Sequence, residues 1–470
     1  MISLGQPATP EVAAAFEVIE PDGRRRDDSA VPCIVGRDVV IDPGRLGAYC
    51  LRDLPARVDD LVLLAGAVAF ADKSVTRKVS RAWERRLHLS VPVLEPGFWD
   101  QRVIGRALSD TLGLLTGDVW SFEFRQRKQA LSAGRQGALP FGDSPALVMP
   151  FSNGLDSLAV ARLTATSRPD VGLILVTTGR LGDPDKDWRL RHLRGRYHRV
   201  SVPFRLARRE GGVRFREQSY RSRAFVFGVM AGVAASMLGA ERILVAESGQ
   251  GALGPWLTPV GNEAPDLRTH PVFTRRLAGL LGLVFERRVR FDHPQIWATK
   301  GETLAQLRGR GLAGDWYRTR SCSRDARDVS LGGGRIQCGV CANCLLRRQS
   351  LMASGLNESD DRYLWPRLSE RSLGAAAAAG SRAATANDER HANCGVLAMA
   401  ELAALARADG RHSPLDWAAE ELAVALDESV ASVAPRLRRL LAAHRAEWEA
   451  FIGAQGPESF VGRWTEQALC

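Results

Sequence analysis

The sequence predicts an α/β protein whose largest part is a doubly wound parallel sheet. Four apolar runs of β-type residues follow one another from Ala146 onward, and helical segments separate them. Strands that are apolar along their whole length are buried on both faces, which is typical of a parallel sheet covered by helices. A second observation is that four of the eight cysteines crowd between Cys322 and Cys344, which predicts a metal site next to this sheet.

The residues before this sheet show a mixed pattern. The stretch CIVGRDVVI has strand character, Leu61 to Phe70 is an apolar helical segment, and Leu87 to Val93 alternates as a half-buried strand does. A helical stretch over 103–115 and the strand-like VWSFEF follow. We therefore predict a separate small α+β domain over residues 1–140, whose function no chemical motif indicates.

Residues 146–312 carry the main α/β pattern, with the runs ALVMPF, GLILVTT, YHRVSVPF and RILVAES. An uncharged stretch from Ala224 to Ala240 lies between the third run and the fourth. It is rich in Gly and Ala and is shorter than the roughly 20 apolar residues that a membrane span needs. We therefore predict a buried helix packed on the sheet, and no contact with a membrane.

Three further parts follow the sheet. Residues 313–350 are Gly-rich and hold the cysteine cluster, so we expect an irregular zinc subdomain that the metal stabilises. Residues 374–390, GAAAAAGSRAATANDER, are small, polar and unpatterned, which predicts a linker. Helical periodicity over 396–406 and 415–452 predicts a C-terminal helical region spanning 391–470.

Composition restricts the function only weakly. The chain has 64 Lys plus Arg against 53 Asp plus Glu, a net charge of +11, and a basic chain attracts polyanions such as ATP or nucleic acid. Its basic residues are dispersed and do not alternate with aromatic residues, so nucleic-acid binding is weakly supported. The first residues show no targeting segment, and we expect the protein in the cytoplasm. Because the chain has only five lysines, a lysine within a motif, such as Lys300, is informative.

The clearest chemical motif is the loop between the first strand of the sheet and the helix that follows it. Its residues are Phe151, Ser152, Asn153, Gly154, Leu155, Asp156 and Ser157. Free backbone N–H groups and the helix dipole at such a position bind phosphate, and a glycine lets the backbone approach closely. The two serine hydroxyls can donate to phosphate oxygens, and the aspartate can cap the helix or orient Mg²⁺. A capping role without any ligand is the alternative, because Ser, Asn and Asp commonly cap helices.

The cysteine cluster has the spacing of a metal site. Cys338, Cys341 and Cys344 stand at two-residue intervals, and Cys322 lies upstream across a Gly-rich turn. Four thiolates can surround one tetrahedral Zn²⁺, and such a filled site is structural, with no position open for catalysis. The alternatives are an iron–sulfur cluster, which also uses closely spaced cysteines, and a catalytic thiol pair.

These motifs carry a resemblance. The phosphate loop is similar to the Ser-Gly-Gly-X-Asp-Ser loop of the PP-loop ATP pyrophosphatases, with Asn153 in place of the first glycine. Together with Cys322 and the Cys-Gly-X-Cys-X-X-Cys-X-X-Arg pattern that runs from Cys338 to Arg347, it makes the chain resemble the QueC family of 7-cyano-7-deazaguanine synthases. Two shorter elements are also similar, Ser222-Arg223 and the stretch from Thr299 to Glu302.

The resemblance covers residues 146–348. Typical family members begin near the phosphate loop and end soon after the cysteines, whereas this chain extends in both directions. Extended forms of this kind resemble the QueC-like proteins of bacterial anti-phage defence systems. The resemblance therefore implies a role in defence, with other subunits of a defence complex as partners.

What the family implies for function is a ligase-type reaction with ATP, Mg²⁺ and structural Zn²⁺. ATP adenylates the carboxylate of 7-carboxy-7-deazaguanine, the phosphate loop holds the pyrophosphate, and an amine then attacks the activated acid. Asp156 and Lys300 are implied as catalytic, and Arg223 and Arg347 as substrate contacts. The amine is ammonia where an amide or nitrile forms, and in an extended member a protein amine could be the acceptor.

Two other functions stay open at the level of sequence. One is a tRNA-modifying enzyme of the same ATP-using class, which the net positive charge favours. The other is a zinc-stabilised subunit without catalysis, which the replacement of a loop glycine by Asn153 favours. Measuring whether AMP and pyrophosphate are released separates the two enzymes from the inactive subunit.

Overall fold

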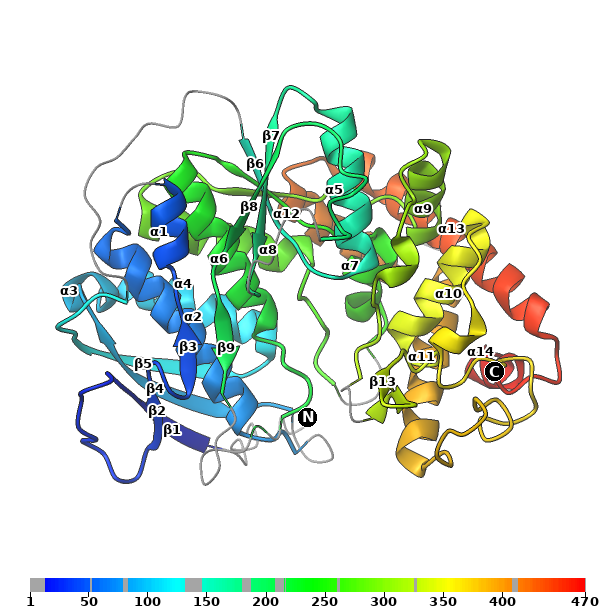
Figure 1. Cartoon of the computed structure of the whole chain (residues 1–470), viewed down its shortest axis with the longest axis horizontal. Helices are drawn as coiled ribbons and strands as arrows, with labels where there is room; N and C mark the ends of the chain where they lie inside the picture. The colour runs from blue at the N-terminus through cyan, green and yellow to red at the C-terminus, as the bar shows by residue number, and fades with distance from the viewer. Residues whose placement is uncertain are drawn as a thin grey trace, which may run out of the picture.

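The structure, a computed structural model of the 470-residue chain, describes residues 13–50, 53–78, 83–131, 146–179, 187–207, 215, 217–259, 263–324, 328–407 and 413–469. Lys186, Cys470 and the expected domain boundary at residue 140 lie outside the described residues. The chain builds two parallel sheets with helices between them, and a helical region lies on the far side of the second sheet (Figure 1).

The first sheet is parallel throughout. Its strand order is β2-β1-β4-β5, with β1 Ala13–Ile19, β2 Val31–Ile34, β4 Arg86–Val93 and β5 Val119–Gln126. The helices in this part of the chain are α1 Gly44–Cys50, α2 Ala56–Ser74, α3 Pro96–Trp99 and α4 Arg102–Thr116. The predicted helices and the strands β4 and β5 are confirmed, whereas the stretch CIVGRDVVI divides into β2 and the strand Val39–Ile41, which belong to different sheets. The α+β arrangement is wrong, because the strands are parallel and helices connect β2 to β4 and β4 to β5 along the chain.

The second sheet is also parallel, with the strand order β11-β10-β6-β7-β8. The strands are β6 Ala146–Pro150, β7 Gly172–Thr177, β8 Tyr197–Ser201, β10 Arg242–Leu244 and β11 Arg290–Asp292. Four of them are the four predicted runs, and β11 is an addition that the sequence analysis did not find. Numbered along the sheet-forming part of the chain, the order is 3-2-1-4-5, so it reverses beside β6.

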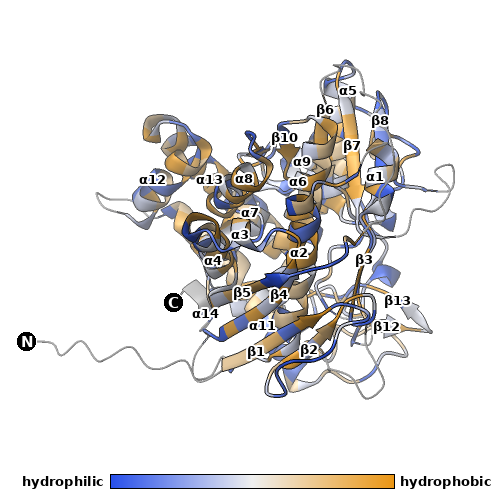
Figure 2. Cartoon of the chain, turned by 90° about the vertical axis from the view of Figure 1, so that its left-hand side faces the viewer, coloured by the Kyte–Doolittle hydropathy of each residue, from blue (hydrophilic) through white to orange (hydrophobic). Residues whose placement is uncertain are grey.

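Helices cover both faces of the second sheet. On one face α5 Leu155–Ser167 packs against β7, and on the other α6 Arg223–Leu238 packs against β6, β7 and β10. Val148 and Ile174 point into the core on the α6 side, whereas Met149 and Leu175 belong to a separate core on the other. Figure 2 shows the resulting hydrophobic β6 and β7 among the helices. The predicted burial on both faces is confirmed.

Three more helices surround this sheet, α7 Gly249–Leu257, α8 Pro271–Phe285 and α9 Lys300–Gly309. The apolar stretch after residue 223 is α6, as predicted, and its glycines allow close packing: a Cβ at Gly232 would meet Leu281 Cδ1 of α8 at 2.6 Å. Among the described residues, no helix is both long and apolar enough to cross a membrane.

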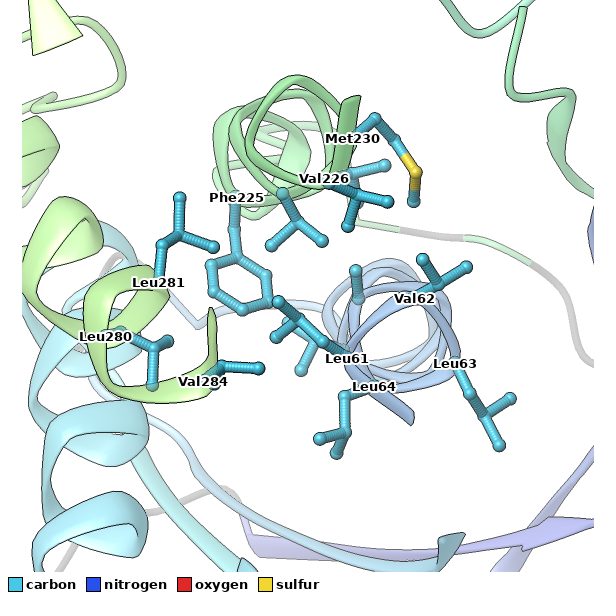
Figure 3. Close-up of a cluster of buried hydrophobic side chains, with 14 of the residues drawn as sticks. Leu61, Val62, Leu63, Leu64, Phe225, Val226, Met230, Leu280, Leu281 and Val284 are labelled. Carbon is cyan, nitrogen blue, oxygen red and sulfur yellow. The ribbon is translucent and has the colours of Figure 1, made fainter. Parts of the chain in front are cut away.

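The first sheet does not form the separate domain that its sequence predicts. Helices α2 and α4 pack on its strands, and the same helices pack on α6 and α8 of the second sheet. Figure 3 shows the ring of Phe225, from α6, between Leu281 of α8 and Leu61 of α2. A two-stranded antiparallel ribbon, β3 Val39–Ile41 with β9 Phe204–Leu206, also joins the two parts. One continuous core therefore spans residues of both sheets.

The remaining residues form a cysteine-containing segment and a helical region. Their elements are η2 Trp316–Arg318, β12 Ser330–Leu331, β13 Gly334–Arg335, α10 Ala342–Ser354, η4 Asp360–Arg362, α11 Ala386–Ala404, η5 Leu405–Arg407, α12 Pro414–Leu426, α13 Val430–Gln455 and α14 Phe460–Leu469. Three of the four cysteines lie in one core with residues of α11, α13 and α14. The cysteine segment is thus packed into the helical region.

The predicted linker over 374–390 is packed against this core. Ala376 is fully buried, and Ala378 N donates to Leu364 O at 2.9 Å. Thr385 caps α11 through a capping box with Asp388, so the last residues of the segment are helical. The small residues that predicted a linker instead allow the chain to pack closely against the core.

Candidate functional site

The phosphate loop lies at the carboxyl end of β6, beside the point where the strand order reverses. Gly154 precedes α5 with an extended backbone, φ −76° and ψ 154°. Ser152 Oγ accepts a hydrogen bond from Gly154 N at 3.0 Å and lies 2.9 Å from Ser157 Oγ. In parallel α/β sheets, ligands bind outside the carboxyl ends of the strands at such a reversal. The loop therefore has the position and the donors that a phosphate site needs.

The other loop residues have different environments. Phe151 and Leu155 are buried, so their side chains anchor the loop in two cores and only their backbone can face a ligand. Asn153 Oδ1 accepts from Arg189 Nη1 at 3.0 Å, and Asn153 O accepts from Arg320 N at 3.0 Å. Asn153 has no positive φ. The left-handed backbone that would favour the family's glycine at this position is therefore absent.

Lys300 reaches the loop from the first residue of α9. Its ammonium lies 2.8 Å from Asp156 Oδ2, and only 5% of the residue is exposed. Burial disfavours its charge, but Asp156 and Glu247 outweigh burial and raise the pKa of Lys300. The two residues predicted as catalytic, which lie far apart in the sequence, are therefore brought together as an ion pair.

Glu247 is a third member of this cluster and was missed in the sequence. It follows β10, the strand next to β6 in the sheet. Burial and the nearby Asp156 raise the pKa of Glu247 to about 8, and Lys300 opposes this rise. Its position directly after the run RILVA was a usable signal, because carboxyl ends of neighbouring parallel strands meet at one edge.

Arg223 lines a pocket that includes none of the phosphate-loop residues. It is exposed at the first residue of α6, and its guanidinium lies 5.1 Å from the ring centre of Phe227. The pocket has a volume of about 280 Å³ and is lined by Thr178, Phe204, Arg205, Leu206, Tyr220, Arg223, Val226 and Phe227. Aromatic rings and guanidinium groups suit a flat, polar heterocycle.

Arg347 is not placed to contact a substrate. It is fully buried, and its guanidinium donates to both carboxylate oxygens of Glu358, at 2.9 and 2.7 Å. A third donor reaches Thr319 Oγ1 at 2.8 Å. These hydrogen bonds occupy donors on all three guanidinium nitrogens, so the predicted substrate contact is not supported. Arg347 instead ties α10 to Glu358 and to the segment that leads to Cys322.

The four predicted cysteine ligands converge. The sulfur atoms of Cys322, Cys338, Cys341 and Cys344 lie within 4.8 Å of one another, and those of Cys338 and Cys344 are 3.7 Å apart. Cys338 Sγ accepts from Cys341 N at 3.2 Å, a bond that stabilises a thiolate. Gly339 has φ +89°, and a Cβ there would meet Trp365 O at 2.7 Å, so the turn between Cys338 and Cys341 requires glycine.

This donor set fits a metal ion. Four sulfur ligands in close reach suit Zn²⁺ in tetrahedral coordination and leave no position open for a substrate. The cluster could hold a metal ion such as zinc, as the spacing predicts.

No protein-family model matches the sequence, and no curated protein matches it significantly.

Proposed function

We propose that this chain is an ATP-dependent enzyme of the QueC-like class that adenylates the carboxylate of 7-carboxy-7-deazaguanine. The observation that carries the proposal is the pairing of Asp156 in the phosphate loop with Lys300 of a distant helix, at the carboxyl edge of β6. A buried ammonium beside a helix N-terminus is suited to the negative charge of a triphosphate. The strand order 3-2-1-4-5, with helices on both faces, supports a doubly wound PP-loop fold.

In the proposed reaction, a carboxylate oxygen of the substrate attacks the α-phosphorus of ATP. The bond from that phosphorus to the bridging oxygen breaks, and pyrophosphate leaves. The N–H groups at the start of α5 and the hydroxyls of Ser152 and Ser157 hold the pyrophosphate, while Lys300 neutralises its charge. An amine then attacks the acyl carbon and AMP leaves, so no protein nucleophile is needed.

Asp156 would hold a magnesium ion, because its carboxylate stands in the phosphate loop and oxygen donors of this kind are the usual protein ligands of magnesium. Magnesium would supply charge neutralisation on the phosphates. The Arg223 pocket is the best candidate for a planar base, since guanidinium and aromatic groups line it. Arg347 has no part in this proposal, because Glu358 holds it.

The biological setting is proposed from the resemblance alone. We propose a cytoplasmic enzyme of an anti-phage defence system, whose amine acceptor is ammonia or an amine of a partner protein. The cysteine cluster is proposed to hold structural zinc, which stabilises the region after the sheet.

The deciding experiment follows the carboxylate oxygen. The purified zinc-containing protein is incubated with ATP, Mg²⁺ and ¹⁸O-labelled 7-carboxy-7-deazaguanine, with and without ammonium. We expect pyrophosphate release that depends on the acid, and AMP that carries one ¹⁸O atom after the amine has attacked. Label in AMP is specific for an acyl adenylate, because hydrolysis of ATP by water leaves AMP unlabelled.

A matched pair of variants ties the activity to the loop. Replacing both Ser152 and Ser157 with alanine should lower the rate by about 10²-fold, the effect of losing donors to developing charge. Ser167→Ala, at the exposed end of the same helix, should leave the rate unchanged. If no acid-dependent release occurs with ammonium or with tRNA, the catalytically inactive subunit becomes the better hypothesis.

A further inference from the structure

Helix α13, in the C-terminal helical region, contacts the turn that carries Lys300. Arg439 of α13 donates to both carboxylate oxygens of Glu302, at 2.5 and 3.0 Å. Glu447, further along α13, accepts a hydrogen bond from Thr299 Oγ1. Thr299 and Glu302 form the capping box of α9. Side chains of α13 therefore hold both residues that define where α9 begins.

A buried polar network connects α13 to the backbone of Lys300 itself. Lys300 N donates to Gln250 Oε1 at 2.8 Å, and Gln250 Nε2 donates to His444 Nδ1 at 2.8 Å. His444 Nε2 donates to Met399 O at 3.0 Å. Burial lowers the pKa of His444 to about 4, so its ring is neutral near pH 7 and Nδ1 acts as an acceptor. The network thus has a fixed direction of donors and acceptors.

Steric fit completes this contact. A Cβ at Gly301 would collide with the Glu447 carboxylate and would lie 3.0 Å from Ala353 Cβ. A methyl group on the residue after Lys300 would therefore displace the Glu447 carboxylate from its present position.

We propose that α13 positions the Lys300 ammonium beside Asp156, with Glu447 as the positioning residue. Glu447 acts through Thr299, Gly301 and Gln250. An effect of α13 on catalysis rests on the proposed function, whereas its effect on the position of Lys300 does not. The helical region after the cysteine segment therefore helps to position a side chain of the site at the sheet edge.

The test measures the position of Lys300 directly. Amine acetylation by an activated ester is followed by mass spectrometry in the full-length protein, where five lysines give few competing signals. Because Lys300 is buried and ion-paired, its labelling should be slow. Glu447→Ala should raise the labelling rate of Lys300 about fivefold or more, a size that networked residues commonly show. Glu449→Ala, two residues along on the exposed side of α13, should not change it.

A second arm tests the steric contact. Gly301→Ala should also raise Lys300 labelling, and the double variant with Glu447→Ala should show less than the product of the two single effects, because the colliding carboxylate is gone. If Glu447→Ala does not fold, Arg439→Gln provides a milder variant, since this pair is half-exposed. Unchanged Lys300 labelling in folded Glu447→Ala or Arg439→Gln protein would overturn the inference.

The activity arm separates this inference from the proposed function. Glu447→Ala should lower kcat for AMP release by about 10- to 100-fold while changing KM for ATP much less, as expected when a catalytic group is displaced rather than removed. Faster labelling of Lys300 in a protein whose wild type never releases AMP would support the positioning role and contradict the function. If the wild type releases AMP and Glu447→Ala changes neither Lys300 labelling nor kcat, the proposed function is supported and the positioning role is contradicted.

Discussion

At the scale of single residues, the site centres on the ammonium of Lys300, which faces Asp156 and Glu247. Lys300 bonds to Asp156 at 2.8 Å and also interacts with Glu247. A buried ammonium is costly without a partner, so the pair holds the side chain in place before any ligand arrives. The raised pKa of Glu247 means that this carboxyl is mainly protonated near neutral pH, which limits the repulsion between the two acids.

Lys300→Met gives the first prediction at this scale. The substitution removes the ammonium that would neutralise phosphate charge, and we expect the rate of acid-dependent AMP release to fall by about 10²- to 10³-fold. Lys128→Gln is the matched control, because Lys128 is exposed and far from the sheet edge along the chain. An unchanged rate in Lys300→Met, with the ion pair lost, would contradict the catalytic role of this lysine.

Sequence could identify Lys300 and the loop because each lies within a short local pattern. It could not show the environment of a side chain: Arg347 stands at a motif position yet is buried against Glu358. Glu447 had no signal at all, because its contact with Thr299 joins residues 148 positions apart. Contacts of this kind depend on how whole helices pack, which no local pattern encodes.

At the scale of elements, apolar runs predicted the strands well because buried parallel strands must be apolar. Strand β11 was missed since it has only three residues, Arg290–Asp292, two of them charged, at the edge of the sheet. The predicted helical stretch over 415–452 is two helices, α12 and α13, because Asp427 has a left-handed backbone with φ +60°. The hydrophobic periodicity of a sequence therefore does not reveal short edge strands or a single left-handed residue between two helices.

The cysteine segment supports the second prediction. Its sulfur cluster lies in the same core as Trp448 and Val461, so losing the metal should destabilise α13 and α14 as well as the turn itself. We expect about one zinc per chain, and Cys344→Ser should lower both the zinc content and the melting temperature. Cys394→Ser is the matched control, because Cys394 lies on α11 and is not among the four converging cysteines.

Metal analysis and thermal unfolding of both variants test whether the four cysteines bind zinc. Full zinc content in Cys344→Ser would contradict the four-sulfur site. Iron with a visible charge-transfer band in the wild type would instead favour the iron–sulfur cluster.

At the scale of the whole molecule, the two sheets fold as one body. Beyond the shared apolar core, Asp72 of α2 accepts from Ser222 N and Oγ at 3.0 and 2.8 Å, at the start of α6. Asp72 also pairs with Arg85 at 2.6 Å, and all three residues are buried. Burial opposes the charge of Asp72, but Arg85 and Arg77 outweigh it and lower the pKa of Asp72. The residue that precedes Arg223 is therefore held by the N-terminal part of the chain.

The substitution Phe225→Ala tests whether the two sheets unfold together. The ring is fully buried between α2 and α8, and a Phe-to-Ala change in such a core costs about 3–5 kcal/mol of unfolding free energy. Because the core is continuous, we expect both sheets to lose stability together, as one transition at lower denaturant concentration. Val424→Ala is the control: this side chain is 66% exposed, and its loss should change stability by no more than about 0.5 kcal/mol.

The readout is hydrogen exchange at amides of β4 in the first sheet and β7 in the second, measured with denaturant unfolding. If the two parts share one core, Phe225→Ala lowers the free energy of opening by the same amount in both strands, so exchange becomes faster in both. This is because the amides of both strands exchange only on global unfolding. Faster exchange in β7 with unchanged exchange in β4 would mean that the first sheet is an independent domain. In that case the N-terminal residues could not be what fixes the start of α6, and the position of Arg223 would depend on the second sheet alone.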